Sequence, residues 1–180
     1  MRKFLLIIPL VLSSILANAQ ENMGGFKLID NTLIWQEVYS FPETDSASVQ
    51  RFFYSNSKFK TDNNVSTAYI VLRDYVDIPF GQRPVFFNDV SRIKFVVQIK
   101  NDRYRVTVQS LEPIDTFIRN NTSRSYEDAK YLSNFLEHYV KKNGELKASF
   151  YNNAPSTDEA LLVLFDYKTN NSTIVLDDDF

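Results

Sequence analysis

Residues 91–111 read SRIKFVVQIKNDRYRVTVQSL, and this stretch decides the fold. Apolar and polar residues alternate on both sides of Asn101-Asp102, which is the period of a strand with one buried face. A two-residue turn at Asn101-Asp102 pairs Ile99 with Tyr104, and from there apolar residues face apolar ones. A slip of one residue would place each apolar row opposite a polar row. The stretch therefore predicts an antiparallel hairpin that covers a core with one face only.

The polar side of this hairpin is rich in basic residues, although the chain has a formal net charge of −2. Five cationic side chains fall on that side: Arg92, Lys94, Lys100, Arg103 and Arg105. They fit either a solvated sheet face with acidic neighbours from other strands or a surface that binds an anionic ligand. Such a ligand would be an acidic glycan, a lipid headgroup phosphate or an acidic patch on a protein. The five residues are therefore the candidate binding residues.

Strand and helix signals surround the hairpin. Residues 33–41 and 66–76 are rich in β-branched and aromatic residues and predict strands. Apolar residues at helical spacing predict a helix from about 45 to 56 and a longer helix from about 125 to 140. The predicted fold is α+β, with an antiparallel sheet of about five strands and two helices packed on one face.

The C-terminal residues leave two structures open. Asn152–Pro155 predicts a loop, and Ser156 to Glu159 spell a capping box that favours a helix directly afterwards. Residues 160–176 fit either that helix or a hairpin. We therefore expect a C-terminal helical extension, 143–180, beyond the main core.

Domain organisation follows from the absence of repeats and low-complexity linkers. Residues 20–31 (QENMGGFKLIDN) are expected to form a short leader. We expect one domain over 20–180, with its core at about 30–142.

Residues 1–19 (MRKFLLIIPLVLSSILANA) have the pattern of a secretory signal peptide. Arg2 and Lys3 precede an apolar run, and Ala17-Asn18-Ala19 supplies the small residues that a signal peptidase reads. The apolar run is shorter than the roughly 20 residues that a membrane span needs. The sequence therefore predicts an exported protein, periplasmic or extracellular, without a transmembrane span after cleavage.

Composition excludes several function classes. Cleavage would remove two of the 20 basic residues and leave 18 against 22 acidic ones, a net charge of −4. This balance argues against general nucleic-acid binding. The chain has no cysteine, which excludes disulfides, thiolate metal sites and cysteine nucleophiles.

Catalytic and metal-binding motifs are weak. His138 is the single histidine, and no nucleophile motif accompanies it. Asp74 and Asp77 have a spacing that defines no geometry, and Asp177–Asp179 has neither the alternation nor the glycine of a calcium loop. We therefore predict no catalytic residue, no metal and no cofactor.

One family resemblance accompanies these patterns. Trp35–Tyr39, Ile93–Ile99, Asn101–Thr107 and the Ala-Asn-Ala-Gln end of the signal peptide resemble a family of uncharacterised secreted proteins of Bacteroidota. The resemblance covers roughly residues 30–140 and implies a fold like that of the TATA-box-binding protein. Asp102 departs from it, because such turns often carry glycine. The family implies no activity, and the shared fold does not transfer DNA binding.

Taken together, the sequence predicts an exported, non-enzymatic module of the cell envelope. It would bind an envelope protein or an anionic glycan or lipid headgroup through the open sheet face. Two other classes of protein stay open. One is a hydrolase whose active site no sequence motif marks, and the other is a structural or assembly component that pairs through a strand edge.

Overall fold

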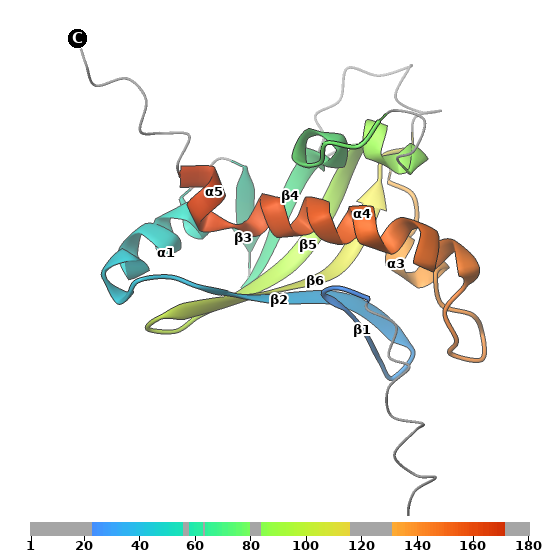
Figure 1. Ribbon diagram of the computed structural model, residues 1–180, viewed down its shortest axis with the longest axis horizontal. Coiled ribbons are helices and arrows are strands. Elements are labelled where there is room, and N and C mark those ends of the chain that lie inside the picture. Colours follow the sequence, from blue (N-terminus) through green and yellow to red (C-terminus); the bar gives the residue numbers. More distant parts are fainter. Residues whose placement is uncertain (1–22, 56–57, 63, 80–83, 116–130, 172–180) are drawn as a thin grey trace, which may run out of the picture.

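The computed structural model describes residues 23–55, 58–62, 64–79, 84–115 and 131–171. In these residues the chain forms one antiparallel sheet of six strands, in the order β1-β2-β6-β5-β4-β3, together with four α-helices (Figure 1). The predicted α+β class is confirmed, with six strands where about five were expected. The predicted signal peptide and the C-terminal aspartates lie outside the described residues.

The strands differ in length, and the longest two form the centre of the sheet. Their bounds are β1 (Phe26–Ile29), β2 (Thr32–Ser40), β3 (Phe59–Asp62), β4 (Val65–Val71), β5 (Val90–Ile99) and β6 (Arg103–Pro113). The predicted strand 66–76 ends at Val71, where the 3-10 turn η2 (Leu72–Tyr75) begins.

The β5–β6 hairpin has the register that the sequence predicts. Ile99 pairs with Tyr104, and the Lys100 N–H donates to the Arg103 carbonyl at 2.8 Å across the two-residue turn. A bulge between Lys94 and Phe95 then shifts the register by one residue. Beyond the bulge Arg92 faces Glu112, whereas an uninterrupted ladder would place it opposite Leu111. The bulge thus turns Leu111 into the core and Glu112 onto the opposite face.

Strand β1 lies in the segment that we expected to be a leader, so that expectation was wrong. It pairs with β2 through a turn at Asp30 and Asn31, which have φ values of 48° and 62°. Two positive φ angles are what a tight hairpin turn of the primed kind requires, and Asp and Asn tolerate them. Four residues are too few for a clear alternation signal, which is why the strand escaped notice.

The helices include a short one after β2 and a long one near the C-terminus. Their bounds are α1 (Ser46–Tyr54), α3 (Phe135–His138), α4 (Ala148–Phe165) and α5 (Tyr167–Asn171). Helix α1 has the predicted position, and its apolar residues Val49, Phe52 and Phe53 are buried. Helix α4 runs across one face of the sheet (Figure 1). In the described residues no helix is both long and apolar enough to cross a lipid bilayer.

The predicted loop at Asn152–Pro155 is wrong, because helix α4 continues through these residues without a break. Ser156 is inside the helix and donates its hydroxyl to the Asn153 carbonyl at 3.1 Å, so the expected capping box does not start a helix there. An interior proline costs roughly 3 kcal/mol. Burial of Phe150 and Ala154 in the first turns offsets this cost. The sequence left a helix or a hairpin open for residues 160–176, and residues 160–165 form the helix, as the last part of α4.

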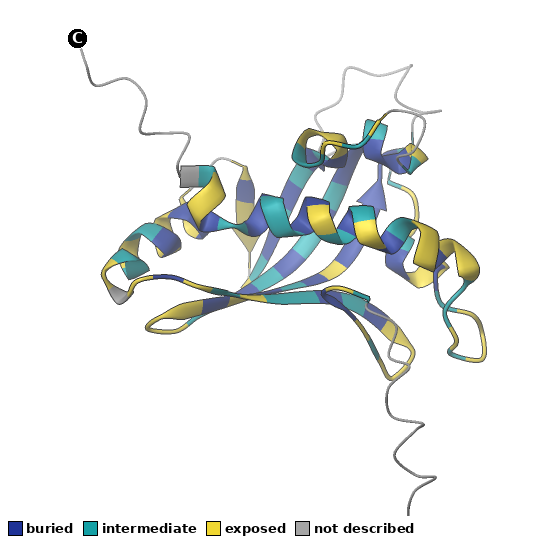
Figure 2. Ribbon diagram, viewed as in Figure 1, coloured by how far each residue is buried: buried dark blue, intermediate teal, exposed yellow. Residues whose placement is uncertain are grey.

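Helix α4 and the sheet share one hydrophobic core, and the burial colours of Figure 2 alternate along the central strands. The Phe165 ring stacks on Trp35 at a centroid distance of 5.9 Å. Asp158 accepts hydrogen bonds from Trp35 Nε1 at 2.7 Å and from the Gly25 N–H at 2.8 Å. A side chain at Gly25 would come within 2.6 Å of the indole nitrogen, so only glycine fits this close approach. These contacts anchor α4 to β1 and β2.

The predicted helix from about 125 to 140 is shorter in the described residues, where α3 has only four residues. Tyr131 instead forms an isolated bridge with Ile114, and residues 125–130 lie outside the described segments. Asn134 caps α3 by accepting from the Leu136 N–H at 3.1 Å, and it also accepts from Leu111 N. In the described residues, this anchoring to β6 fixes the start of α3 at Phe135.

Candidate functional site

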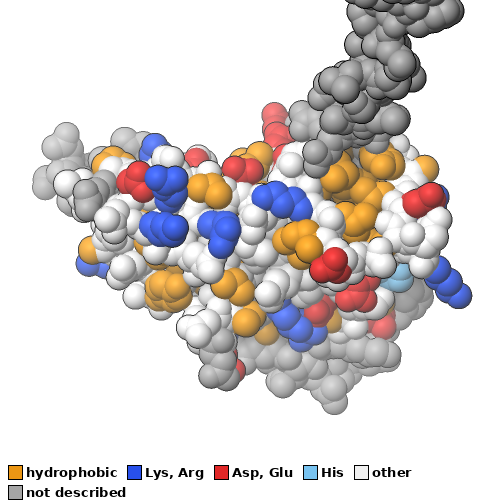
Figure 3. Space-filling model, turned by 90° about the horizontal axis from the view of Figure 1, so that it is seen from below, with side chains coloured by type: hydrophobic (Ala, Val, Ile, Leu, Met, Phe, Trp, Pro, Cys, Tyr) orange, Lys and Arg blue, Asp and Glu red, His pale blue; other side chains and the backbone are white. Residues whose placement is uncertain are grey.

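The face of the sheet opposite α4 carries the five basic residues that the sequence singled out. Because Ile93, Phe95, Tyr104 and Val106 point into the core, their neighbours along β5 and β6 point the other way. We call this side the open face, and Figure 3 views the molecule from that side. The five residues fall into two groups at opposite ends of the hairpin.

The first group is the Glu112 cluster, formed by Arg92, Lys94, Glu112 and Tyr131. Arg92 Nε donates to Glu112 Oε2 at 2.7 Å, and Arg92 Nη2 contacts the same oxygen. Lys94 Nζ lies 3.3 Å from Glu112 Oε1. The Glu112 side chain is only 11% exposed, and the Arg92 guanidinium lies 4.3 Å from the centroid of the Tyr131 ring. Two of the five basic residues therefore share one carboxylate as their counter-ion.

The pKa of Glu112 reflects this environment. Burial alone would raise it, but hydrogen bonds from Arg92 and Ser110 and the positive charges of Arg92 and Lys94 outweigh burial. The net result is a pKa below the ordinary value of a glutamate. The carboxylate is thus held in its charged form as a structural counter-ion.

The second group is the tip cluster, formed by Lys100, Arg103 and Arg105 around the hairpin turn. Arg103 Nε lies 3.0 Å from Asp102 Oδ1, and both side chains are more than half exposed. Arg105 Nε donates to the amide oxygen of Gln98 at 2.9 Å, which leaves its charge uncompensated. In the described part of the chain, Lys100 and Arg105 form no ion pair with a carboxylate.

The charge of the tip cluster is set by its single acidic neighbour. A hydrogen bond from Arg103 and the nearby cations lower the pKa of Asp102, so this carboxylate is charged at neutral pH. One carboxylate against three cations leaves an excess of positive charge. Lys and Arg side chains gather at the left of Figure 3, on the side of the molecule where Figure 1 shows the hairpin turn.

A polar ladder links β6 to the outer strands on the same face. Lys27 Nζ donates to Gln36 Oε1 at 2.7 Å, and Gln36 Nε2 donates to Thr107 Oγ1 at 3.0 Å. Lys27 has no ion-pair partner in the described segments. It therefore adds a further cation to the open face, and the sequence reasoning missed it because β1 was taken for a leader.

His138 has a hydrogen-bond partner that the sequence reasoning did not foresee. Its Nε2 lies 2.8 Å from Ser133 Oγ, and both residues are exposed. Within the described ranges no carboxylate is hydrogen-bonded to the imidazole, and such a group normally orients a catalytic histidine. Among the residues that the structure describes, the pair therefore has no third member of a hydrolytic triad.

The remaining acidic candidates do not form a site. Asp74 lies 3.3 Å from Arg73 Nε in an exposed ion pair. Over the described residues, no group of three or more His, Asp or Glu side chains has the arrangement of a metal site.

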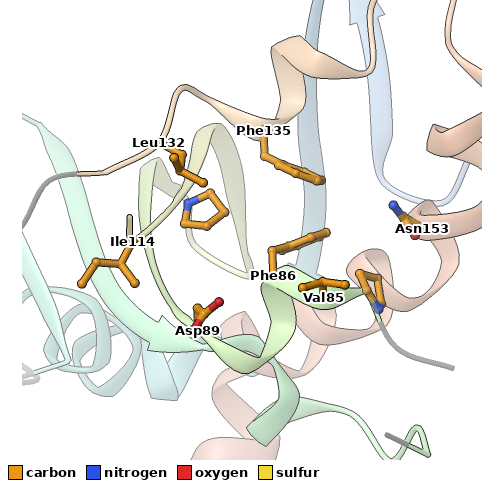
Figure 4. Close-up of a pocket in the computed structure, with 9 residues that line it drawn as sticks. Val85, Phe86, Asp89, Ile114, Leu132, Phe135 and Asn153 are labelled. Atoms are coloured by element: carbon orange, nitrogen blue, oxygen red, sulfur yellow. The ribbon is translucent and has the colours of Figure 1, made fainter. Parts of the chain in front are cut away.

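A pocket of about 540 Å³ opens at the other end of the molecule, between η4 (Val85–Asn88) and α3. Its walls are mostly apolar, and Figure 4 shows the Phe86 and Phe135 side chains lying against each other on one side of it. Asp89 and Asn153 are its polar lining residues. No sequence motif marks this pocket, because its lining residues come from four separate segments of the chain.

No family model, no curated protein and no solved structure matches this chain.

Proposed function

We propose that the protein is an exported, non-enzymatic binding module of the cell envelope that holds an anionic partner on the tip cluster. The export signal and the resemblance to secreted proteins with a fold like that of the TATA-box-binding protein are parts of this proposal. The observation that carries it is the contrast in compensation. Arg92 and Lys94 share one nearly buried carboxylate, Glu112, whereas three cations at the tip have one exposed aspartate.

The geometry of the tip suits an extended polyanion. Arg103 and Arg105 lie two residues apart on one strand, so their side chains leave the same face about 7 Å apart. Strand β4 pairs with β5 only as far as Phe95, so in the described residues the hairpin end has no paired strand on the β4 side. Sulfate, phosphate or carboxylate groups in a row could therefore approach without displacing protein. An acidic glycan presents such a row.

The electrostatic cost of binding at this position is low. The side chains of Arg103 and Asp102 are 58% and 61% exposed and already form an ion pair. A ligand that binds beside them would therefore bury few charged atoms that lack a partner. Arg105 is held by a neutral amide and would exchange it for a charged group with a gain in interaction strength. Binding of this kind weakens as the salt concentration rises.

The test compares binding of the purified protein to dextran sulfate and to neutral dextran at low and high salt. We expect salt-sensitive binding to dextran sulfate alone. Replacing Arg103 and Arg105 with serine should weaken it about tenfold or more and leave the melting temperature nearly unchanged. The control replaces Lys141 and Lys142, which are exposed and lie outside the sheet, and so changes the net charge equally. Equal loss of binding in both double variants would sink the proposal, because net charge alone would then explain it.

The Ser133–His138 hydrogen bond is the one observation that favours the competing hydrolase class. That function predicts hydrolysis of p-nitrophenyl acetate that Ser133→Ala abolishes. A rate that is unchanged in this variant would rule out Ser133 as the nucleophile and contradict the hydrolase function.

A further inference from the structure

The pocket beside α3 has the size and walls of a small-molecule site. Ligand sites in proteins enclose roughly 300–1,000 Å³ and are mostly apolar. This pocket holds about 540 Å³, with Phe86, Phe135, Leu132 and Ile114 among its lining residues. The rings of Phe86 and Phe135 have centroids 4.2 Å apart, which gives the pocket an aromatic wall.

Two of its lining residues are large apolar side chains that are exposed to solvent. Val85 is 83% exposed and Leu132 is 49% exposed, and both are large apolar side chains. Covering such side chains stabilises a complex by about 25 cal/mol for each Å² of apolar surface removed from water. An apolar ligand in the pocket would contact both.

The walls are held by backbone hydrogen bonds and do not need a ligand to form. The Phe87 N–H donates to the Pro84 carbonyl at 3.0 Å, and the Leu132 N–H donates to the Pro113 carbonyl at 2.8 Å. The Ile114 N–H donates to the Val90 carbonyl at 2.8 Å. The first bond closes the η4 turn, and the other two tie β6 and the residue after it to the segment before α3 and to β5, so these walls are ordered without a ligand.

The polar end of the pocket has a defined charge. Figure 4 shows Asp89 between Ile114 and Phe86. Asp89 is half-buried, and it forms no ion pair with the basic residues that the structure describes. A carboxylate in an apolar pocket favours a ligand whose polar end is positively charged and disfavours one whose polar end is negative.

We propose that this pocket binds a small amphipathic molecule with an apolar body and a protonated amine, the amine facing Asp89. The tip cluster takes anions at the other end of the molecule, so this site is independent of the proposed function. The apolar walls supply affinity, and Asp89 supplies the preference for the amine.

The experiment uses three ligands with the same apolar body: n-octylamine, 1-octanol and octanoate. Each is titrated into the isotope-labelled full chain, and the methyl NMR signals of Val85 and Leu132 report binding. We expect the amine to bind most tightly and the carboxylate least, with about a tenfold difference in Kd between them. Asp89→Asn should remove this ranking while the alcohol keeps its affinity. Val85→Ser should weaken all three ligands alike.

Matched controls are available on other surfaces. Asp62→Asn removes an exposed carboxylate from β3, and Val38→Ser removes an exposed apolar side chain from the open face. Both should leave the three Kd values unchanged. Equal Kd values for amine and carboxylate, or a ranking that survives in Asp89→Asn, would overturn the ligand class. The absence of shifts at Val85 and Leu132 with all three ligands would overturn the site itself, as when the chain's own residues fill the pocket.

Discussion

The two ends of the β5–β6 hairpin carry similar basic residues on the same face but differ in how far their charges are compensated. At the Glu112 cluster, Arg92 and Lys94 share a carboxylate whose side chain is 11% exposed. At the tip cluster, Arg105 has only the neutral amide of Gln98, and the Arg103–Asp102 pair is exposed. The first end stabilises the fold, and the second leaves its charge available. A row of cations in a sequence therefore says little about binding until each counter-ion is placed.

The difference has a structural origin in the bulge between Lys94 and Phe95. The bulge brings Glu112 opposite Arg92 and turns it to the open face. Without it, Arg92 would face Leu111, and the whole strand would resemble the tip. One extra residue in β6 thus separates a half of the hairpin whose cations share a nearly buried carboxylate from a half whose cations are exposed.

The largest expected effect comes from breaking the Glu112 cluster. Glu112→Gln would leave Arg92 and Lys94 half-buried without a counter-ion, and we expect a loss of about 2 kcal/mol in the free energy of unfolding. Urea denaturation measures it. The control is Asp102→Asn at the tip, where water screens the cations, and it should shift the midpoint little. Equal shifts in both variants would contradict the distinction between the two ends.

The pH dependence of stability should reveal the same carboxylate. The pKa of Glu112 is lower in the folded protein than its ordinary value, so the folded state binds this proton less readily than the unfolded state. Its stabilising contribution is therefore complete above the ordinary pKa and disappears as the pH falls through the folded pKa. The difference in unfolding free energy between the wild type and Glu112→Gln should shrink in that acidic range. A difference that stays constant with pH would show that charge is not its cause.

How far the sequence predicts this molecule depends on whether a pattern is local. Alternation and the two-residue turn predicted the hairpin and placed Lys100, Arg103 and Arg105 on one face. The only sequence signal of the bulge is a break in the alternation of apolar residues. Apolar residues occupy the even positions 104, 106 and 108, and the next one is Leu111 at an odd position. The sequence reasoning did not use this change, and so it missed Glu112 as a counter-ion.

Other features depend on contacts between distant segments, which no local pattern encodes. Helix α4 continues through Pro155 because Phe150 and Ala154 are buried in the core, and local propensity predicted a loop there. The pocket combines residues from Pro84 to Asn153, so it is defined only once the chain has folded.

A smaller effect is expected from the aromatic side of the Glu112 cluster. Tyr131→Leu removes the ring beneath the Arg92 guanidinium, and we expect a loss of about 0.5–1 kcal/mol in the free energy of unfolding. Tyr54→Leu, at an exposed tyrosine of α1, is the matched control and should cost less. If the ring acts through Arg92, the loss in Tyr131→Leu should fall when Arg92 is already glutamine. Additive losses in the double variant would show that the ring acts through other contacts.

The smallest change in stability should come from making the tip resemble the Glu112 cluster. Gln98 lies opposite Arg105, so Gln98→Glu would give this arginine a charged partner across the strands. An opposite-charge pair in this position stabilises a sheet by about 0.2–1 kcal/mol. The same pair should weaken binding to dextran sulfate severalfold, since Arg105 would no longer offer an uncompensated charge. Gln109→Glu is the matched control, because it adds the same charge to an exposed position of β6 that is not paired with Arg105. Weaker binding in Gln98→Glu than in Gln109→Glu would assign the effect to the local pair, and equal binding would show that the tip acts only through the overall charge of the face.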